Sequence, residues 1–161
     1  MTVTAEDSDL SFSRQALKKG AKNLQFATFY LGQELFGINI LQVQEILMDQ
    51  IITPVPLAPP FVSGLISLRG QIVTAVDLKR RLGIDKESQY EYAYHIVVKG
   101  IHSISSLQVD RIGEVIAVKG TDLDPPPDSL KGIEIKYLEG VYPLEHEILA
   151  VLNIDNILEA N

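Results

Sequence analysis

Short runs of apolar residues, separated by glycine, proline and polar clusters, follow one another along most of this chain. The first, at 26–31, is rich in aromatic residues that favour β-structure, and a turn at 32–34 follows it. A second run, at 35–40, returns with Phe36, Ile38 and Ile40 in alternation. Two such runs around a short glycine-containing turn predict a β-hairpin.

Residues 41–48 fit two different periods. On a helix, Ile40, Val43 and Leu47 would share one face, whereas on a strand Val43, Glu45 and Leu47 would share it. The strict alternation just before this stretch favours a strand, with a break in the chain near Leu41.

A proline-rich connection comes next, with prolines at Pro54, Pro56, Pro59 and Pro60. Proline cannot donate a hydrogen bond to a β-ladder, so we expect a rigid loop between strands here. A ligand for an SH3 domain is the alternative interpretation of the same prolines.

Two further strands are predicted at 61–68 and 71–76, with a turn at Arg69-Gly70. Asp77 is then placed to cap the N-terminus of a short helix over 78–82. Gly83 would end this helix in the left-handed conformation.

The second half of the chain repeats the first in outline. Gly100 lies 68 positions after Gly32, and Gly132 lies 68 positions after Gly64. Prolines cluster again at 125–127, and Asn153 precedes an apolar run as Asp77 does, 76 positions later. We assign the growth of this offset to a longer hairpin around 142–147.

The repeat predicts two β-barrel units, about 24–90 and 91–158, within a single domain over 24–161 that follows a flexible polar tail at 1–23. A unit of about 65 residues buries only about 60% of its unfolded surface, so neither unit should be stable alone. The units are therefore expected to share a core or to exchange strands. Short strands between glycine and proline turns favour small barrels over α/β layers.

Composition limits the partners. The net charge is -7 and the pI about 4.9, and such a surface would repel a phosphate backbone, so nucleic acid is not expected as a partner. The local basic run Lys79-Arg80-Arg81 is expected to be a solvated helix face. The chain has no cysteine, which excludes thiol catalysis, disulfides and cysteine-ligated zinc and fits a reducing cytoplasm.

The beginning of the chain carries Glu6, Asp7 and Asp9 and has no apolar segment typical of a signal peptide. No apolar run approaches the roughly 18 residues that a membrane-spanning helix needs. We therefore expect a cytoplasmic protein that reaches a membrane only through a partner, without direct insertion.

Motifs for catalysis are missing from the sequence. His95, His102 and His146 do not stand at metal-ligand spacing from one another, and Ser67 lacks the flanking glycines of a nucleophile elbow. Neither a phosphate-binding loop nor a dinucleotide-binding glycine motif is present. No enzyme activity, cofactor or metal is expected.

One segment carries a family resemblance. Residues 61–83, FVSGLISLRGQIVTAVDLKRRLG, resemble the signature of the CheW family, in which an LRG turn is followed by an apolar strand, a DL pair and a basic stretch. Upstream, 43–46 match the family's V-x-E element, and downstream Val109-Asp110 matches its VD segment. Thr74 replaces the family's usual proline and Ser106 its common glycine, and both differences concern backbone geometry. The similarity runs from Leu24 to Leu158.

The resemblance implies a mainly β fold of two intertwined, five-stranded SH3-like β-barrels with short capping helices. It also implies a non-catalytic adaptor that couples methyl-accepting chemoreceptors to a CheA-type histidine kinase in chemotaxis signalling. One surface would bind the regulatory domain of the kinase, and a groove between the barrels would bind the cytoplasmic tip of the receptor. The protein would thereby be recruited to membrane-bound receptor arrays.

The resemblance places partner binding at Val43, Glu45 and Arg69, and on looser local matches at Val98 and Val115. Val43 would give a docked helix an apolar contact and Glu45 a directional charge. The planar fork of Arg69 would hold carboxylates or carbonyls on two strands. From the residues alone, structural alternatives stay open: Arg69 could tie its loop to the barrel, Val43 could pack in the core, and Glu45 could be a solvated charge.

Two further interpretations of function stay open. An adaptor of a related chemosensory or pilus-motility pathway would share the same signature. A small-molecule-binding β-barrel would need a polar or aromatic cleft, and the lack of tryptophan counts against a sugar site.

Overall fold

The computed structural model describes residues 23–84 and 94–159, so the predicted tail lies outside the described residues except for Asn23. The first half of the chain contains, in order, β1 (Asn23–Leu31), β2 (Glu34–Asn39), the 3-10 helix η2 (Ile40–Gln42), β3 (Val43–Met48), β4 (Val62–Leu68), β5 (Gln71–Asp77) and α2 (Leu78–Leu82). The second half contains β6 (Tyr94–Lys99), β7 (Ile104–Val109), β8 (Arg111–Lys119), η3 (Gly120–Asp122), β9 (Ser129–Leu130), β10 (Ile133–Glu134), η4 (Ile135–Tyr137), β11 (Leu138–Pro143), β12 (Ile148–Leu152) and α3 (Ile154–Leu158).

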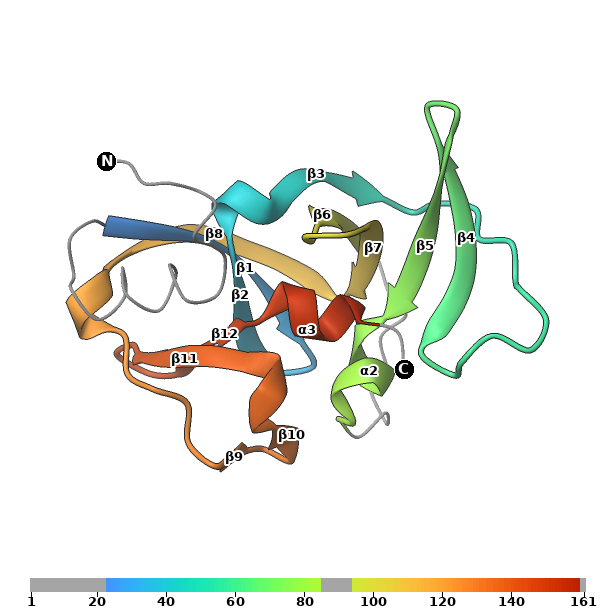
Figure 1. Cartoon of the computed structure of the whole chain (residues 1–161). Coiled ribbons are helices and arrows are strands. Elements are labelled where there is room, and N and C mark those ends of the chain that lie inside the picture. Colours follow the sequence, from blue (N-terminus) through green and yellow to red (C-terminus); the bar gives the residue numbers. More distant parts are fainter. Residues whose placement is uncertain (1–22, 85–93, 160–161) are drawn as a thin grey trace.

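The strands form two five-stranded sheets and one small hairpin (Figure 1). The order of the first sheet is β11-β12-β2-β1-β8, and that of the second is β3-β6-β7-β5-β4. Each sheet therefore takes strands from both halves of the chain: β1 and β2 lie with β8, β11 and β12, whereas β6 and β7 lie with β3, β4 and β5. The predicted intertwined, mainly β fold is confirmed, although neither sheet closes into a continuous hydrogen-bonded ring over the described strands.

The chain crosses between the sheets at two points. The first crossing is η2, between β2 and β3, and the side chain of Asn39 caps it by accepting a hydrogen bond from the Leu41 amide at 2.9 Å. The predicted break near Leu41 and the predicted strand after it are therefore both confirmed. The second crossing, between β7 and β8, is made by the single residue Asp110.

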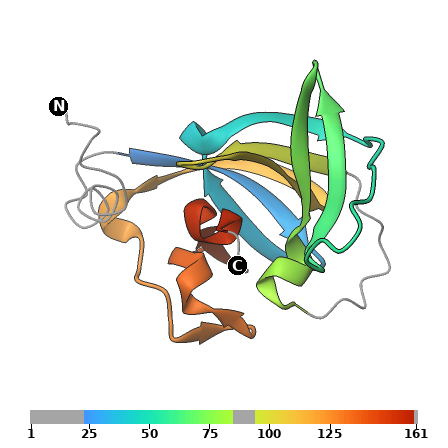
Figure 2. The same ribbon diagram turned by 45° about the vertical axis from the view of Figure 1, so that its right-hand side comes forward.

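The two short helices are capped as the sequence predicts. The carboxylate of Asp77 accepts a hydrogen bond from the Arg80 amide at 3.1 Å, and Gly83 ends α2 with a φ of 74°. The amide oxygen of Asn153 accepts one from the Asn156 amide at 3.0 Å and so begins α3. Figures 1 and 2 both place α2 beside α3.

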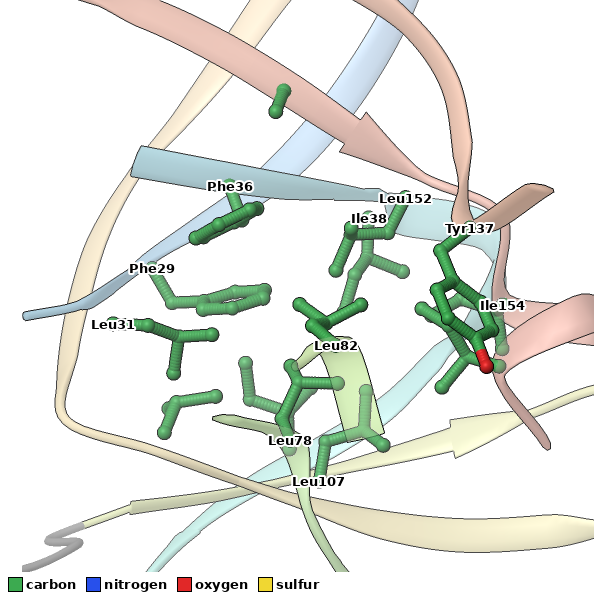
Figure 3. Close-up of a cluster of buried hydrophobic side chains, with 14 of the residues drawn as sticks. Phe29, Leu31, Phe36, Ile38, Leu78, Leu82, Leu107, Tyr137, Leu152 and Ile154 are labelled. Carbon is green, nitrogen blue, oxygen red and sulfur yellow. The ribbon is translucent and has the colours of Figure 1, made fainter. Parts of the chain in front are cut away.

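One core is shared by both sheets and both helices. Figure 3 shows side chains of β1, β2, β7 and β12 meeting those of α2, η4 and α3. The labelled residues are Phe29, Leu31, Phe36, Ile38, Leu78, Leu82, Leu107, Tyr137, Leu152 and Ile154. Because both halves contribute to this one cluster, neither half has an apolar interior of comparable size of its own.

The internal repeat is present in the topology, but one predicted equivalence is wrong. Gly64 in β4 corresponds to Gly140 in β11, because the residue after each glycine bridges an equivalent segment, Leu65 to Thr53 and Val141 to Asp124. The offset at these glycines is already 76, so Gly132 is not the counterpart of Gly64. The hairpin around 142–147 is no longer than the β4–β5 hairpin, and the extra residues lie between β8 and β11, where β9, β10 and η4 are inserted.

The basic triplet of α2 is not a solvated face. Lys79 is buried, and its ammonium group lies 2.8 Å from the buried carboxylate of Asp110. The guanidinium group of Arg81 lies 4.2 Å from the centre of the Phe61 ring and donates to the Ile157 carbonyl at 2.8 Å. Only Arg80 faces solvent, because the other two side chains join α2 to the sheet crossing and to α3.

Candidate partner-binding site

The β4–β5 hairpin places Arg69 at its tip. Leu68 pairs with Gln71, which leaves a two-residue loop in which Arg69 has a φ of 53° and Gly70 a φ of 83°. Positive φ at both central residues is the type I′ geometry that matches the twist of a hairpin. Glycine adopts it freely, but an arginine does so under strain, and such strain is typical of functional positions.

Arg69 forms a two-pronged ion pair with Glu45. Its Nη2 lies 2.7 Å from Oε1 of Glu45, and its Nη1 lies 2.5 Å from Oε2. These hydrogen bonds hold the pKa of the Glu45 carboxyl below its usual value. Glu45 belongs to β3 and Arg69 follows β4, the two edge strands of the second sheet, so the pair bridges the two edges of that sheet.

Val43 and Val98 are paired across β3 and β6, with a register irregularity between Val43 and Glu45. Val43 is half-buried and packs against the main core, so it has both a core contact and an accessible surface. Val98 is fully buried at 0% exposure and presents no surface to a partner in this conformation.

Val115 lies elsewhere in the fold. It belongs to β8 in the first sheet, is 56% exposed, and pairs with Ala27 of β1. The five predicted residues are therefore not one cluster: Glu45 and Arg69 contact each other, Val43 and Val98 form a second pair, and Val115 stands on the other sheet.

Exposed apolar side chains on the elements that carry the Glu45–Arg69 pair were not predicted. Ile46 and Met48 are exposed on β3, and Ile51 follows them at 90% exposure, while Ile72 is exposed on β5. An edge strand with exposed apolar residues is unusual, because such edges normally carry charges or proline. The sequence does carry a signal for this exposure. Apolar residues occupy both faces of the predicted strand, with Val43 and Leu47 on one face and Ile46 and Met48 on the other.

His95 is buried between β3 and β7, with its Nδ1 2.9 Å from the Ser106 hydroxyl. The described residues contain no cluster of three metal-ligating side chains. Burial lowers the pKa of His95 below its usual value, and the charge of Asp49 opposes this effect only in part. The protonation of His95 is therefore expected to be coupled to folding.

We predict that the free energy of unfolding decreases as the pH is lowered below about 6.5, the ordinary histidine pKa. In that range the unfolded chain binds a proton at His95 and the folded chain does not, so the slope should reach about 1.4 kcal/mol per pH unit. Urea unfolding at pH 7.5 and 5.5 measures this difference, which should shrink in His95→Gln and persist in His146→Gln, where the histidine is exposed. An equal pH effect in both variants would contradict the assignment to His95.

The fold has a counterpart among solved structures. It is similar to the scaffolding protein TtCheW from Thermoanaerobacter tengcongensis, with a TM-score of 0.80 and 31% identity, over 87% of this chain and 95% of that one. The architecture is thus a strand-exchanged, double-sheet β fold of the same class as that structure.

Sequence comparisons are more specific. The model of the CheW-like domain matches residues 25–161. The chemotaxis protein CheW of Treponema pallidum is 35% identical over 143 residues, which cover 86% of this chain and 84% of that protein. That of Helicobacter pylori is 31% identical over 137 residues, covering 84% and 82%. The chain belongs to the CheW-like family.

One further observation concerns membranes. Over residues 23–84 and 94–159, no helix has the length and apolar character that would let it cross a bilayer.

Proposed function

We propose that this protein is a non-catalytic adaptor that couples methyl-accepting chemoreceptors to a CheA-type histidine kinase. Contacts with these partners would recruit it from the cytoplasm to membrane-bound receptor arrays. The observation that carries the proposal is the Glu45–Arg69 pair, which falls on the family's motif positions and is held at a strained turn.

The receptor tip is assigned to the surface around this pair. Chemoreceptor tips are helical hairpins, and a helix docks through apolar anchors and a few oriented polar groups. Ile46 and Met48 are exposed on β3, the strand that carries Glu45, and Ile72 is exposed on β5, in the hairpin that carries Arg69, so both elements of the pair also supply apolar area. The two side chains hold each other in position, so the partner would meet a preorganised charge pair rather than two mobile ones.

The three valines take different roles in this proposal. Val43 would contribute apolar contact through its accessible side, and Val98 would support Val43 from the core without touching the partner. Val115 would belong to a separate contact, since it lies on β8 in the first sheet.

The test is a pair of binding titrations with the purified chain. One uses the regulatory domain of the CheA-type kinase from the same genome, and the other uses a receptor-tip fragment. Saturable binding to both, at about micromolar strength or tighter, is the expected result. If the folded chain bound neither partner, the proposed coupling function would be excluded.

We predict that Glu45→Ala and Arg69→Ala each weaken binding of the receptor-tip fragment by about tenfold, since arginine is enriched among the few residues that carry most of the affinity of an interface and Glu45 holds Arg69 in position. The urea midpoint should change little, because a solvent-screened pair adds little stability. Calorimetric titration measures the affinities. Arg80→Ala and Glu134→Ala, which remove exposed charges elsewhere, serve as controls. Unchanged binding of both partners by the two test variants would exclude this site assignment.

A further inference from the structure

A second groove lies among three turns of the chain. It is formed by the β1–β2 turn, the β9–β10 hairpin and the β11–β12 hairpin, and it encloses a cavity of about 510 Å³. This volume falls within the range of about 300–1,000 Å³ that is usual for binding sites. We call it the acidic groove and define it by its floor residues Leu35, Phe36, Ile133 and Ala150 and its rim carboxylates Glu34, Glu145 and Glu147.

One wall of the acidic groove is the insertion that breaks the repeat. β9 and β10 have no counterpart between β3 and β4, where the first half has only an irregular loop. The insertion brings Leu130 and Lys131 to the rim. The two halves therefore present different surfaces at equivalent ends, and only the second half has this wall.

The rim repeats the turn geometry and the ion pairing found at Arg69. Lys131 and Gly132 form a two-residue loop between Leu130 and Ile133, with φ values of 56° and 86°. Lys131 is thus a second basic residue held in the left-handed conformation at a hairpin tip. Its ammonium group lies 3.1 Å from the carboxylate of Glu34, as the Arg69 guanidinium lies against Glu45. A strained backbone at an exposed, charge-paired position is again typical of a binding surface.

Charge around the groove is predominantly negative. Glu34, Glu145 and Glu147 supply three carboxylates against the single ammonium group of Lys131. The Tyr30 hydroxyl donates to Glu147 at 3.1 Å, which holds this carboxylate in place. Glu145 is 86% exposed, and its contact with His146, at 3.8 Å, is long.

The floor of the groove is apolar. Leu35, Phe36, Ile133 and Ala150 are buried beneath it. Ile148 is 49% exposed and offers accessible apolar area at the rim. An apolar floor below an acidic rim complements a ligand with an apolar centre and cationic flanks.

We propose that the acidic groove is a docking site for a partner protein that presents an apolar side chain flanked by lysine or arginine. A protein fits better than a small cation, because charges this exposed attract a free cation weakly in water. A protein surface that covers the rim excludes water and strengthens the same charges. The proposal goes beyond the coupling function and does not depend on which surface the receptor or the kinase uses.

The test uses the ¹⁵N-labelled chain and two blocked pentapeptides, Gly-Arg-Leu-Lys-Gly and Gly-Glu-Leu-Glu-Gly. The basic peptide should cause saturable shifts of backbone amides around Phe36, Leu130 and Ile148, with a dissociation constant in the millimolar range expected for so small a ligand. The acidic peptide should cause none. Equal shifts from both peptides, or shifts that map to other residues, would overturn the proposal.

Matched variants separate the groove from general surface effects. Glu145→Lys should weaken binding of the basic peptide by about tenfold, whereas Glu134→Lys, an equal charge change at another exposed glutamate with an equally long 3.8 Å contact to a basic side chain, should not. Ile148→Ser should also weaken it, and Ile135→Ser should not, although the two isoleucines are 49% and 46% exposed. Equal effects of test and control variants would mean that the peptide senses only net charge or general apolar surface.

Discussion

Replacing Asp110 by alanine should destabilise the protein by about 3–5 kcal/mol, because it leaves the ammonium group of Lys79 in a buried site without its 2.8 Å carboxylate partner. The substitution also removes the acceptor of the Gly32 amide, which donates at 2.7 Å to Oδ2, the same oxygen that lies against Lys79. Total stabilities of domains are only about 5–15 kcal/mol, so this loss should be visible as a large fall in the urea midpoint.

The control for this prediction is an exposed ion pair of similar length. Glu34→Ala removes the partner of Lys131, at 3.1 Å, where solvent screens both charges, so it should change stability by about 1 kcal/mol or less. A second variant, Asp110→Leu combined with Lys79→Met, should be more stable than Asp110→Ala, because it removes both buried charges together. An Asp110→Ala protein as stable as Glu34→Ala would show that the buried pair has no structural importance.

The position of Asp110 explains why this pair matters to the fold. Asp110 is the one-residue crossing from β7 in one sheet to β8 in the other. Its amide donates to the Tyr30 carbonyl at 3.1 Å, and its side chain reaches the β1–β2 turn and α2. One residue thus joins both sheets and a capping helix, and its loss should loosen their relative placement.

Gly64→Ala should destabilise the protein by about 3 kcal/mol, at the upper end of the usual effect of overpacking. Gly64 has a φ of 153°, and a Cβ atom there would overlap the Thr53 carbonyl oxygen and lie 2.7 Å from Cγ2 of Ile52. Thr53 and Leu65 exchange two backbone hydrogen bonds of 2.9 and 2.8 Å, which hold the proline-rich connection against the β4 edge. The backbone on both sides of the new methyl group is therefore fixed, and the overlap cannot be relieved cheaply.

Gly83→Ala is the matched control. Gly83 also has a positive φ, 74°, but nothing lies within 4 Å of the position of its Cβ. Only the left-handed strain applies there, so the loss should be about 1–2 kcal/mol. Thermal and urea unfolding of both variants measure the difference. Equal losses would mean that backbone strain alone, and not the contact with Thr53, explains the glycine at 64.

The Gly64 prediction also bears on the proposed coupling function. The proline-rich connection joins β3, which carries Glu45, to β4, which leads to Arg69. Releasing it from the β4 edge should loosen the hairpin that holds Arg69 against Glu45. A Gly64→Ala protein that still folds should therefore bind the receptor-tip fragment more weakly than Gly83→Ala does.

Local features of the fold were predictable from the sequence. The β1–β2 hairpin, the break at Leu41, the cap at Asp77 and the left-handed Gly83 each depend on residues within a few positions of one another. The sequence also predicted the family and the mainly β class, because the LRG segment is a contiguous motif. It selected Glu45 and Arg69 as separate candidates through that same resemblance.

Long-range features required the tertiary structure. The sequence allowed the two halves to share a core or to exchange strands, and the structure has both features, because each sheet takes strands from both halves and both halves contribute to one core. The insertion was assigned to the wrong hairpin, because Gly64 and Gly132 share a residue type and a spacing but not a bridging partner. The sequence predicted a solvated Lys79, and this was wrong because the crossing at Asp110 places a buried carboxylate beside its ammonium group.

The candidate site divides in the same way. Residue types and motif positions could indicate Glu45 and Arg69, but their contact joins edge strands of one sheet across 24 positions of sequence. The acidic groove joins three turns from both halves, and no local pattern marks it. Turns, caps and alternation are set by neighbouring residues, so the sequence alone determined them. Contacts between distant segments depend on which strand edges meet and which charges are buried together, and only the folded chain decides that.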